Sequence, residues 1–163
     1  MKRTAISMLR MLAICGSLLA FTTACDDDDD DDLPIVDDDM EFNDIQLSGA
    51  NERPDSVDTD GFGTFNGTYD DATNTLDYTV TWTLGNPQDS VTAMHFHGPA
   101  DTTAAAPPVV PITGFDTDSV GTFTDSAVLT DDQEDDLRDG LWYINIHSGT
   151  FPNGELRGQL IED

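Results

Sequence analysis

The three histidines of this chain are its best candidates for binding a ligand. His95 and His97 are two positions apart, and His147 follows later in the chain. Side chains at positions i and i+2 of a β-strand point to the same side, so the first two imidazoles should project together. Neutral imidazole nitrogens are common ligands of copper and zinc. The spacing therefore predicts a three-histidine site for copper or zinc, with a fourth coordination position left open.

The same histidines also suit a purely structural role. His95 and His97 can hydrogen-bond the loop around Gly98 and Pro99, and His147 can pair with Glu155 or hold the following turn. Both interpretations remain open from the sequence.

Alternating apolar and polar residues predict that the body of the chain is an antiparallel β-sheet. The clearest case is 75–84, where Leu76, Tyr78 and Val80 share one face. A bulge is expected near Gly63 or Gly67, because Phe62 and Phe65 otherwise fall on opposite faces. The predicted strands are 41–47, 61–69, 75–84, 91–97, 109–112, 120–129 and 141–147, followed by a hairpin that turns at 151–154.

The strands that carry the histidines each have one strongly apolar face. Met94 and Phe96 should point into the core, as should Ile144 and Ile146, so all three histidines should lie on outward faces. One short helix is expected after Thr130, which can form a capping box with Gln133, and Gly140 should end it.

The final hairpin should place polar partners beside the site. If its loop centres near Pro152, His147 lies opposite Arg157. We expect Arg157, Glu155 and Asn145 to support the ligands from behind; for Glu155 and Arg157 the alternative is a salt bridge that fixes the hairpin register. Residues 104–108 could overhang the site, although a plain connection is favoured.

The first 24 residues are predicted to be a leader rather than part of the fold. A basic start, an apolar run too short to span a bilayer, and small residues before Cys25 resemble a bacterial lipoprotein signal, in which the cysteine is lipidated after cleavage. Residues 25–40 include seven consecutive aspartates, Asp26–Asp32, and are expected to be an acidic, disordered tether. The expected location is the cell envelope, lipid-anchored at the outer membrane or cell surface, or else outside the cell.

Charge and cysteine content exclude several functions. Six Lys and Arg against 33 Asp and Glu give a formal net charge of −27, which argues against a nucleic-acid partner. Such a surface repels anionic headgroups, so membrane contact is expected through the lipid anchor only. Both cysteines, Cys15 and Cys25, precede the predicted domain, which therefore contains no disulfide or thiolate site.

Four stretches in order resemble the CHRD domain, the module named after the chordin proteins: Leu47–Pro54, Ala93–Ala100, Leu141–Ser148 and Asn153–Leu160. Arg53 departs from the pattern, since a small apolar residue is commoner there. The resemblance covers the predicted domain 41–163. It implies an all-β, antiparallel, immunoglobulin-like or Greek-key β-sandwich or barrel with one short helix, and it implies no settled activity.

The histidine arrangement also resembles copper/zinc superoxide dismutase, a Greek-key β-sandwich. That resemblance implies that His95, His97 and His147 bind copper and that Arg157 attracts an anion. The bridging histidine, the zinc ligands and the stabilising disulfide of that family have no counterparts here.

The expected function is binding, with copper or zinc as the candidate cofactor and an unidentified protein or glycan as a further partner. The alternatives are a redox metalloenzyme and a structural or adhesive module that uses an exposed sheet edge. Enzymatic activity is the less favoured interpretation, because the sequence has no nucleophilic triad, paired-carboxylate signature or phosphate loop.

Overall fold

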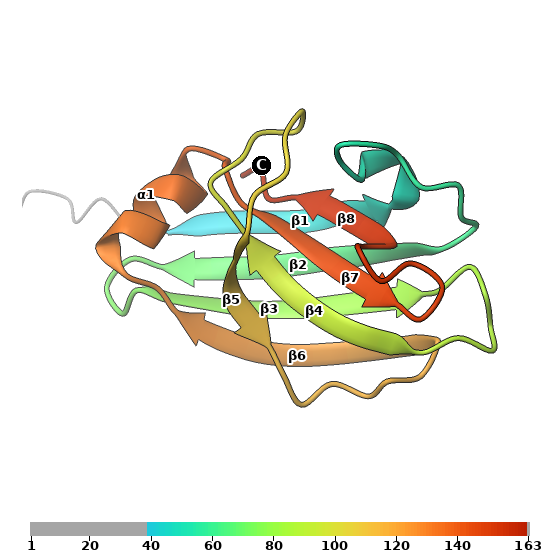
Figure 1. Cartoon of the computed structure of the whole chain (residues 1–163). Helices are drawn as coiled ribbons and strands as arrows, with labels where there is room; N and C mark the ends of the chain where they lie inside the picture. The colour runs from blue at the N-terminus through green and yellow to red at the C-terminus, as the bar shows by residue number, and fades with distance from the viewer. Residues whose placement is uncertain (1–38, 163) are drawn as a thin grey trace, which may run out of the picture. The chain divides into compact units, whose positions relative to one another are not determined.

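The computed structural model describes residues 39–162 (Figure 1). The predicted leader 1–24, Cys25 and the acidic segment up to residue 38 lie outside the described residues. Within residues 39–162, no helix has both the length and the apolar character that a membrane span requires.

The described chain is built from antiparallel strands, one 3-10 turn and one α-helix. The strands follow the hydrogen-bonded order β5-β4-β7-β8-β1-β2-β3-β6. The elements are β1 (Met40–Ser48), η1 (Gly49–Asn51), β2 (Phe62–Asp70), β3 (Thr75–Thr83), β4 (Val91–His97), β5 (Pro108–Ile112), β6 (Val120–Val128), α1 (Asp131–Arg138), β7 (Tyr143–Ser148) and β8 (Leu156–Gln159).

The eight strands form one nearly closed, barrel-like sheet, which confirms the predicted all-β antiparallel class. Strands β5, β4, β7 and β8 form one half, and β1, β2, β3 and β6 form the other, so that the two halves face each other (Figure 1). The halves meet at β1 and β8 through a single paired position, Ser48 with Arg157. This short junction is where the sheet bends back over its own core.

Apolar side chains from both halves fill the space between them. The alternation predicted for 75–84 is confirmed, because Leu76, Val80 and Trp82 are each at most 2% exposed. Phe96 of β4 meets Tyr78 of β3 with ring centroids 5.0 Å apart. Burying side chains of this size contributes about 1.5–3 kcal/mol each, so the outward face of β4 is held in place by a packed inner face.

The helix follows its predicted signals. The Thr130 side chain accepts a hydrogen bond from the Gln133 N–H, and the Gln133 side chain accepts one from the Thr130 N–H. Leu137 is buried, and Gly140 follows the helix with a φ of 68°.

The bulge expected in β2 is wrong. β2 pairs regularly with β3 from Phe62 opposite Thr83 to Asp70 opposite Thr75, and Phe62 is 60% exposed. Gly63 takes the inward position, where a Cβ would collide with the backbone of β3, so the ladder continues with Phe62 facing solvent. The irregularity lies instead in β1, where Asp44 has a φ of 52°.

The predicted register of the last hairpin is wrong by two residues. Arg157 pairs with Asn145 rather than with His147. The reason is a longer loop, in which the N–H groups of Ser148 and Gly154 both donate to the Phe151 carbonyl. Because side chains alternate with a period of two, this even shift keeps Arg157 on the outward face and moves it along that face.

Candidate metal site

The structure brings the three predicted histidines together on one outward face. His95 and His97 leave β4 on the side opposite Met94 and Phe96, and His147 leaves the adjacent strand β7. Their ring centroids are 5.5 Å apart for the β4 pair, 5.2 Å for His95 with His147, and 6.1 Å for His97 with His147. One nitrogen of each ring lies within 4.8 Å of a nitrogen of the other two.

Backbone carbonyls set the protonation of two of these rings. His97 Nδ1 lies 2.9 Å from the Ala106 carbonyl, and His147 Nδ1 lies 3.0 Å from the Pro152 carbonyl. A carbonyl oxygen can only accept, so each Nδ1 carries the hydrogen and donates. In the neutral ring, Nε2 then keeps a free lone pair, which is the form that binds a metal.

Three further ring nitrogens, one on each histidine, are buried and have no hydrogen-bond partner among the described residues. They are His97 Nε2, His147 Nε2 and, on the third ring, His95 Nδ1. A buried polar atom without a partner costs about 1–3 kcal/mol, and here three such atoms occur in one cluster. Burial lowers the pKa of His95 and of His97, so both rings are neutral at pH 7. The cluster thus offers three imidazole nitrogens to a cation.

The connection between β4 and β5 covers one side of this cluster. Besides the bond from His97, the Ala106 carbonyl accepts a hydrogen bond from the Tyr143 hydroxyl. The Ala106 N–H in turn donates a hydrogen bond to the Tyr143 hydroxyl oxygen. The favoured interpretation of residues 104–108 as a plain connection is therefore wrong. Their carbonyl groups hold the histidine ring and the tyrosine in place.

Arg157 is on the predicted face, but it does not border His147. It is 1% exposed, and its guanidinium donates to the carbonyls of Asp101 and Ala104 and to the side chain of Gln159, at 2.8–2.9 Å. Its Cζ atom lies 3.6 Å from the centre of the Tyr143 ring. The His97 ring stacks on the other side of the Tyr143 ring, with the two ring centroids 4.9 Å apart. Since β7 lies between β4 and β8, the tyrosine separates Arg157 from His97.

Asn145 lies in the middle of the same face, between His95 on β4 and Arg157 on β8. Its side-chain nitrogen donates to both carboxylate oxygens of Glu52, at 2.9 and 3.0 Å. Burial raises the pKa of Glu52 to about 7, against the opposing effects of the Asn145 hydrogen bond and the charges of Arg157 and Arg53. The pair anchors the segment after η1 over the outward face of β7.

Glu155 does not reach the histidines. Its carboxylate accepts hydrogen bonds from the Thr59 hydroxyl and the Gly85 N–H, both at 2.8 Å. Glu155 lies before the start of β8 and directly after Gly154, whose φ of 129° changes the direction of the chain. Glu155 and Arg157 therefore do not share a face, as they would in one continuous strand. No ion pair between Glu155 and Arg157 is present among the described residues. His147 instead donates a hydrogen bond from Nδ1 to the Pro152 carbonyl, which holds the ring in the way expected of Glu155.

Tyr143 is part of the site but is not among the residues that the sequence singled out. Its ring contacts both a candidate ligand and Arg157, and its hydroxyl joins the covering loop. The alternating pattern of 141–147 identifies the face on which this residue lies, but no local signal identifies the loop that covers that face.

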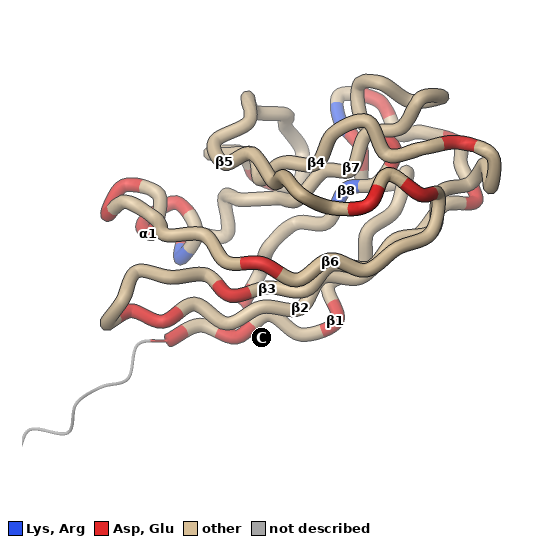
Figure 2. The backbone as a smooth tube through the Cα atoms, turned by 90° about the horizontal axis from the view of Figure 1, so that it is seen from below, with Lys and Arg blue, Asp and Glu red and all other residues tan. Residues whose placement is uncertain are grey.

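Acidic residues surround the fold, whereas basic residues occur at α1 and near β8 (Figure 2). Of the six Lys and Arg, only Arg53, Arg138 and Arg157 belong to the described residues. The resulting negative potential raises the concentration of cations near the histidine cluster.

The chain was compared with family models, with curated proteins and with solved structures. Neither a curated protein nor a solved structure matches it. The family model for the CHRD domain matches residues 44–160, a span that includes the histidine strands, the covering loop and the final hairpin. The chain therefore belongs to the CHRD-domain family.

Proposed function

We propose that this CHRD domain binds one copper or zinc ion through His95, His97 and His147. Two observations carry the proposal: each ring has a buried nitrogen without a partner among the described residues, and one nitrogen of each ring lies within 4.8 Å of one on the other two. Two of the rings are already held in the metal-binding tautomer by carbonyl groups. Metal binding would satisfy all three nitrogens at once.

The spacing of the nitrogens is compatible with one ion after a small closure. Nitrogens about 2.0–2.1 Å from a tetrahedral ion lie about 3.4 Å from one another. The ligand nitrogens now lie within 4.8 Å of one another, so side-chain rotations that shorten the longest separation by about 1.4 Å suffice. His95 is best suited to move, since no hydrogen bond to its Nδ1 restrains it.

Three neutral imidazoles suit both candidate metals, and copper(II) binds such a set more tightly than zinc. A fourth position would face a surface hollow beside His95, lined also by Thr92, Pro111 and Thr113. Because burial lowers the pKa values of His95 and His97, protons should compete with a metal for their nitrogens only at a pH below the ordinary titration range of histidine, and metal affinity should fall there.

Metal titration of selected variants tests the proposal. In His97→Asn and His147→Asn, the amide nitrogen can still donate to the covering carbonyl, as Nδ1 does, but Nε2 is lost. We expect one equivalent of copper(II) to bind the unmodified protein, with nitrogen hyperfine structure in the electron paramagnetic resonance spectrum, and the double variant to lose at least 100-fold in affinity.

The acidic N-terminal segment requires its own control, because aspartates bind divalent cations weakly. A variant with Asp26–Asp32 replaced by serine should keep the tight site and lose only weak binding. Equal copper affinity in the unmodified protein and in the double histidine variant would exclude the proposed site.

A redox enzyme of the superoxide dismutase type is the less favoured alternative. It needs an anion-attracting cation beside the open coordination position, whereas the Arg157 guanidinium lies beyond the Tyr143 ring and is bonded to loop carbonyls. Superoxide consumption by the copper-loaded protein distinguishes the enzyme from the binding module.

We further propose that the domain is tethered to the cell envelope through a lipid on Cys25. The small residues before this cysteine and the acidic run after it support the assignment. Labelling with a fatty acid in a bacterial host should mark the protein and not its Cys25→Ser variant. A variant that is labelled equally would contradict the anchor.

A further inference from the structure

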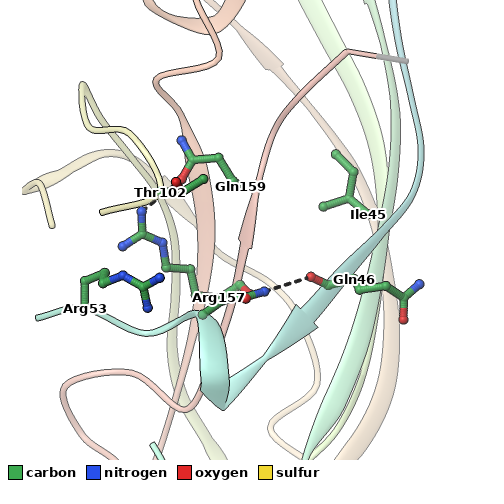
Figure 3. A pocket seen from close by; sticks show the side chains of 7 residues that line it. Ile45, Gln46, Arg53, Thr102, Arg157 and Gln159 are labelled. Carbon is green, nitrogen blue, oxygen red and sulfur yellow. Dashed lines mark hydrogen bonds between the residues drawn. The ribbon is translucent and has the colours of Figure 1, made fainter. Parts of the chain in front are cut away.

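Two of the three arginines in the described part of the chain line the same cavity. It has a volume of about 250 Å³ and lies against β1, η1 and β8. Figure 3 shows the guanidinium groups of Arg53 and Arg157 on one side of it, close to Thr102 and Gln159, with Ile45 on the other. None of the three histidines lines this cavity, so it is separate from the candidate metal site.

Neither of these arginines is paired with a carboxylate within the described residues. Arg157 is 1% exposed and donates only to two carbonyls and an amide oxygen. Arg53 donates to the carbonyls of Ala50 and Glu52. A buried guanidinium without an ion-pair partner is costly, and the neighbouring charge of Arg53 adds repulsion to Arg157.

The third arginine, Arg138, forms ion pairs with carboxylates, as most partly buried arginines do. Arg138 lies 2.8 Å from Asp71 and 2.8 Å from Glu134, so its charge is balanced by two carboxylates. The buried carboxylate of Glu52 provides no such ion pair to Arg157, since its oxygens accept hydrogen bonds from Asn145. In a chain with 33 acidic residues, the lining of this cavity thus contains two guanidinium groups and no carboxylate side chain.

We propose that this cavity binds a small hydroxylated carboxylate, of the size and kind of a sugar acid. The planar guanidinium fork matches a carboxylate through two parallel hydrogen bonds. Thr102 adds a hydroxyl and Asn51 a side-chain oxygen suited to ligand hydroxyls, and Ile45 provides one apolar wall. The volume is below the range of about 300–1,000 Å³ typical of drug-sized ligands, which favours a single sugar unit.

Calorimetric titration with glucuronate, glucose and inorganic phosphate tests the assignment. We expect glucuronate to bind with a stoichiometry of one, glucose to bind at least about tenfold more weakly, and phosphate to bind more weakly than glucuronate. No glucuronate binding at about 10 mM would overturn the proposal. Phosphate binding tighter than glucuronate binding would also overturn it, because the cavity would then be a general oxyanion site.

Matched charge variants connect the binding to the cavity. Arg53→Gln should weaken glucuronate binding at least tenfold, whereas Arg138→Gln, which removes the same charge elsewhere, should leave it unchanged. Arg157→Lys keeps the charge but loses the fork, and it should also weaken binding if Arg53→Gln fails to fold. Equal affinity in the unmodified protein and in the folded Arg53 or Arg157 variant would exclude the site.

Discussion

The outward polar side chains of the two halves of the sheet differ in their exposure to solvent. On β2, β3 and β6 the outward positions form rows of threonines, such as Thr64, Thr81 and Thr122, and the rows lie open to solvent. On β4, β7 and β8 the outward positions carry histidine, asparagine, tyrosine and arginine, and loops cover most of them. The comparison shows that alternation determines which side a residue faces, whereas the covering loops determine whether its polar atoms reach water.

The energetic consequences of this difference are large. Hydroxyls on the open face bond each other or water, as in the 2.8 Å contact between Thr64 and Thr81. On the covered face every polar atom needs a partner from the protein or a ligand. Buried atoms without a partner among the described residues gather there: the three histidine nitrogens and the side-chain oxygen of Asn145. The covered face is therefore where binding sites are expected.

The largest effect should come from removing the cation at the centre of the covered face. Arg157→Gln leaves the carbonyls of Asp101 and Ala104 without their donor and removes the cation from the Tyr143 ring. Each orphaned carbonyl costs about 1–3 kcal/mol, so we expect a loss of about 2–5 kcal/mol in the free energy of unfolding, measured with urea. Arg138→Gln, in an exposed ion-pair cluster, should cost about 1 kcal/mol or less. Equal losses in the two variants would remove the distinction between the regions.

The buried carboxyl on the covered face should make stability depend on pH. Glu52 has a folded-state pKa of about 7, above its ordinary value of 4.5. Its unfolded form ionises first, so stability should fall by about 3 kcal/mol as pH rises from about 4.5 to about 7 and be level above that.

The isosteric variant Glu52→Gln isolates this contribution. It removes the titration, so the stability difference between variant and unmodified protein should change by about 3 kcal/mol over the same pH interval. Urea unfolding at pH 4.5, 6 and 8 measures it. A difference that is constant across these pH values would show that Glu52 does not titrate in this range.

A smaller effect is expected at the tyrosine that joins the covering loop to the sheet. Tyr143→Phe keeps the ring between His97 and Arg157 but removes the hydroxyl that bonds both backbone groups of Ala106. We expect a loss of about 1–2 kcal/mol and faster amide hydrogen exchange at Ala106. Unchanged exchange at this amide would mean that the hydroxyl does not hold the loop.

The smallest effect is expected on the open face. Thr81→Val removes one hydroxyl contact with Thr64 and retains a β-branched side chain in a position that water reaches. We expect a change within about 1 kcal/mol, measured by thermal unfolding. A loss comparable with that of Arg157→Gln would show that the threonine rows are also a tightly coupled network.

The sequence predicts most strands, the helix and the shared face of the histidines, because each follows from local periodicity or capping. The strand 91–97 is reproduced at both ends, and the capping box of Thr130 and Gln133 is confirmed. The hairpin register is not predictable in this way, because it depends on backbone hydrogen bonds at Phe151. The direction of Glu155 depends likewise on the conformation of Gly154.

The sequence allowed residues 104–108 to overhang the site but favoured a plain connection, for a related reason. The contacts of this covering loop with His97, Tyr143 and Arg157 use the backbone of Ala104 and Ala106, and a pattern of side-chain types contains no information about carbonyl groups. The candidate ligands could therefore be predicted, whereas the groups that fix their tautomers could not.

The use of main-chain oxygens in this loop has a consequence for how the sequence can change. The side chains of Ala104 and Ala105 are exposed, and they make no hydrogen bond, so substitutions there should be tolerated as the protein diverges. Insertions or deletions between Asp101 and Ala106 would instead shift the carbonyls away from His97 and Arg157. Across related chains, this segment should vary in composition while its length remains constant.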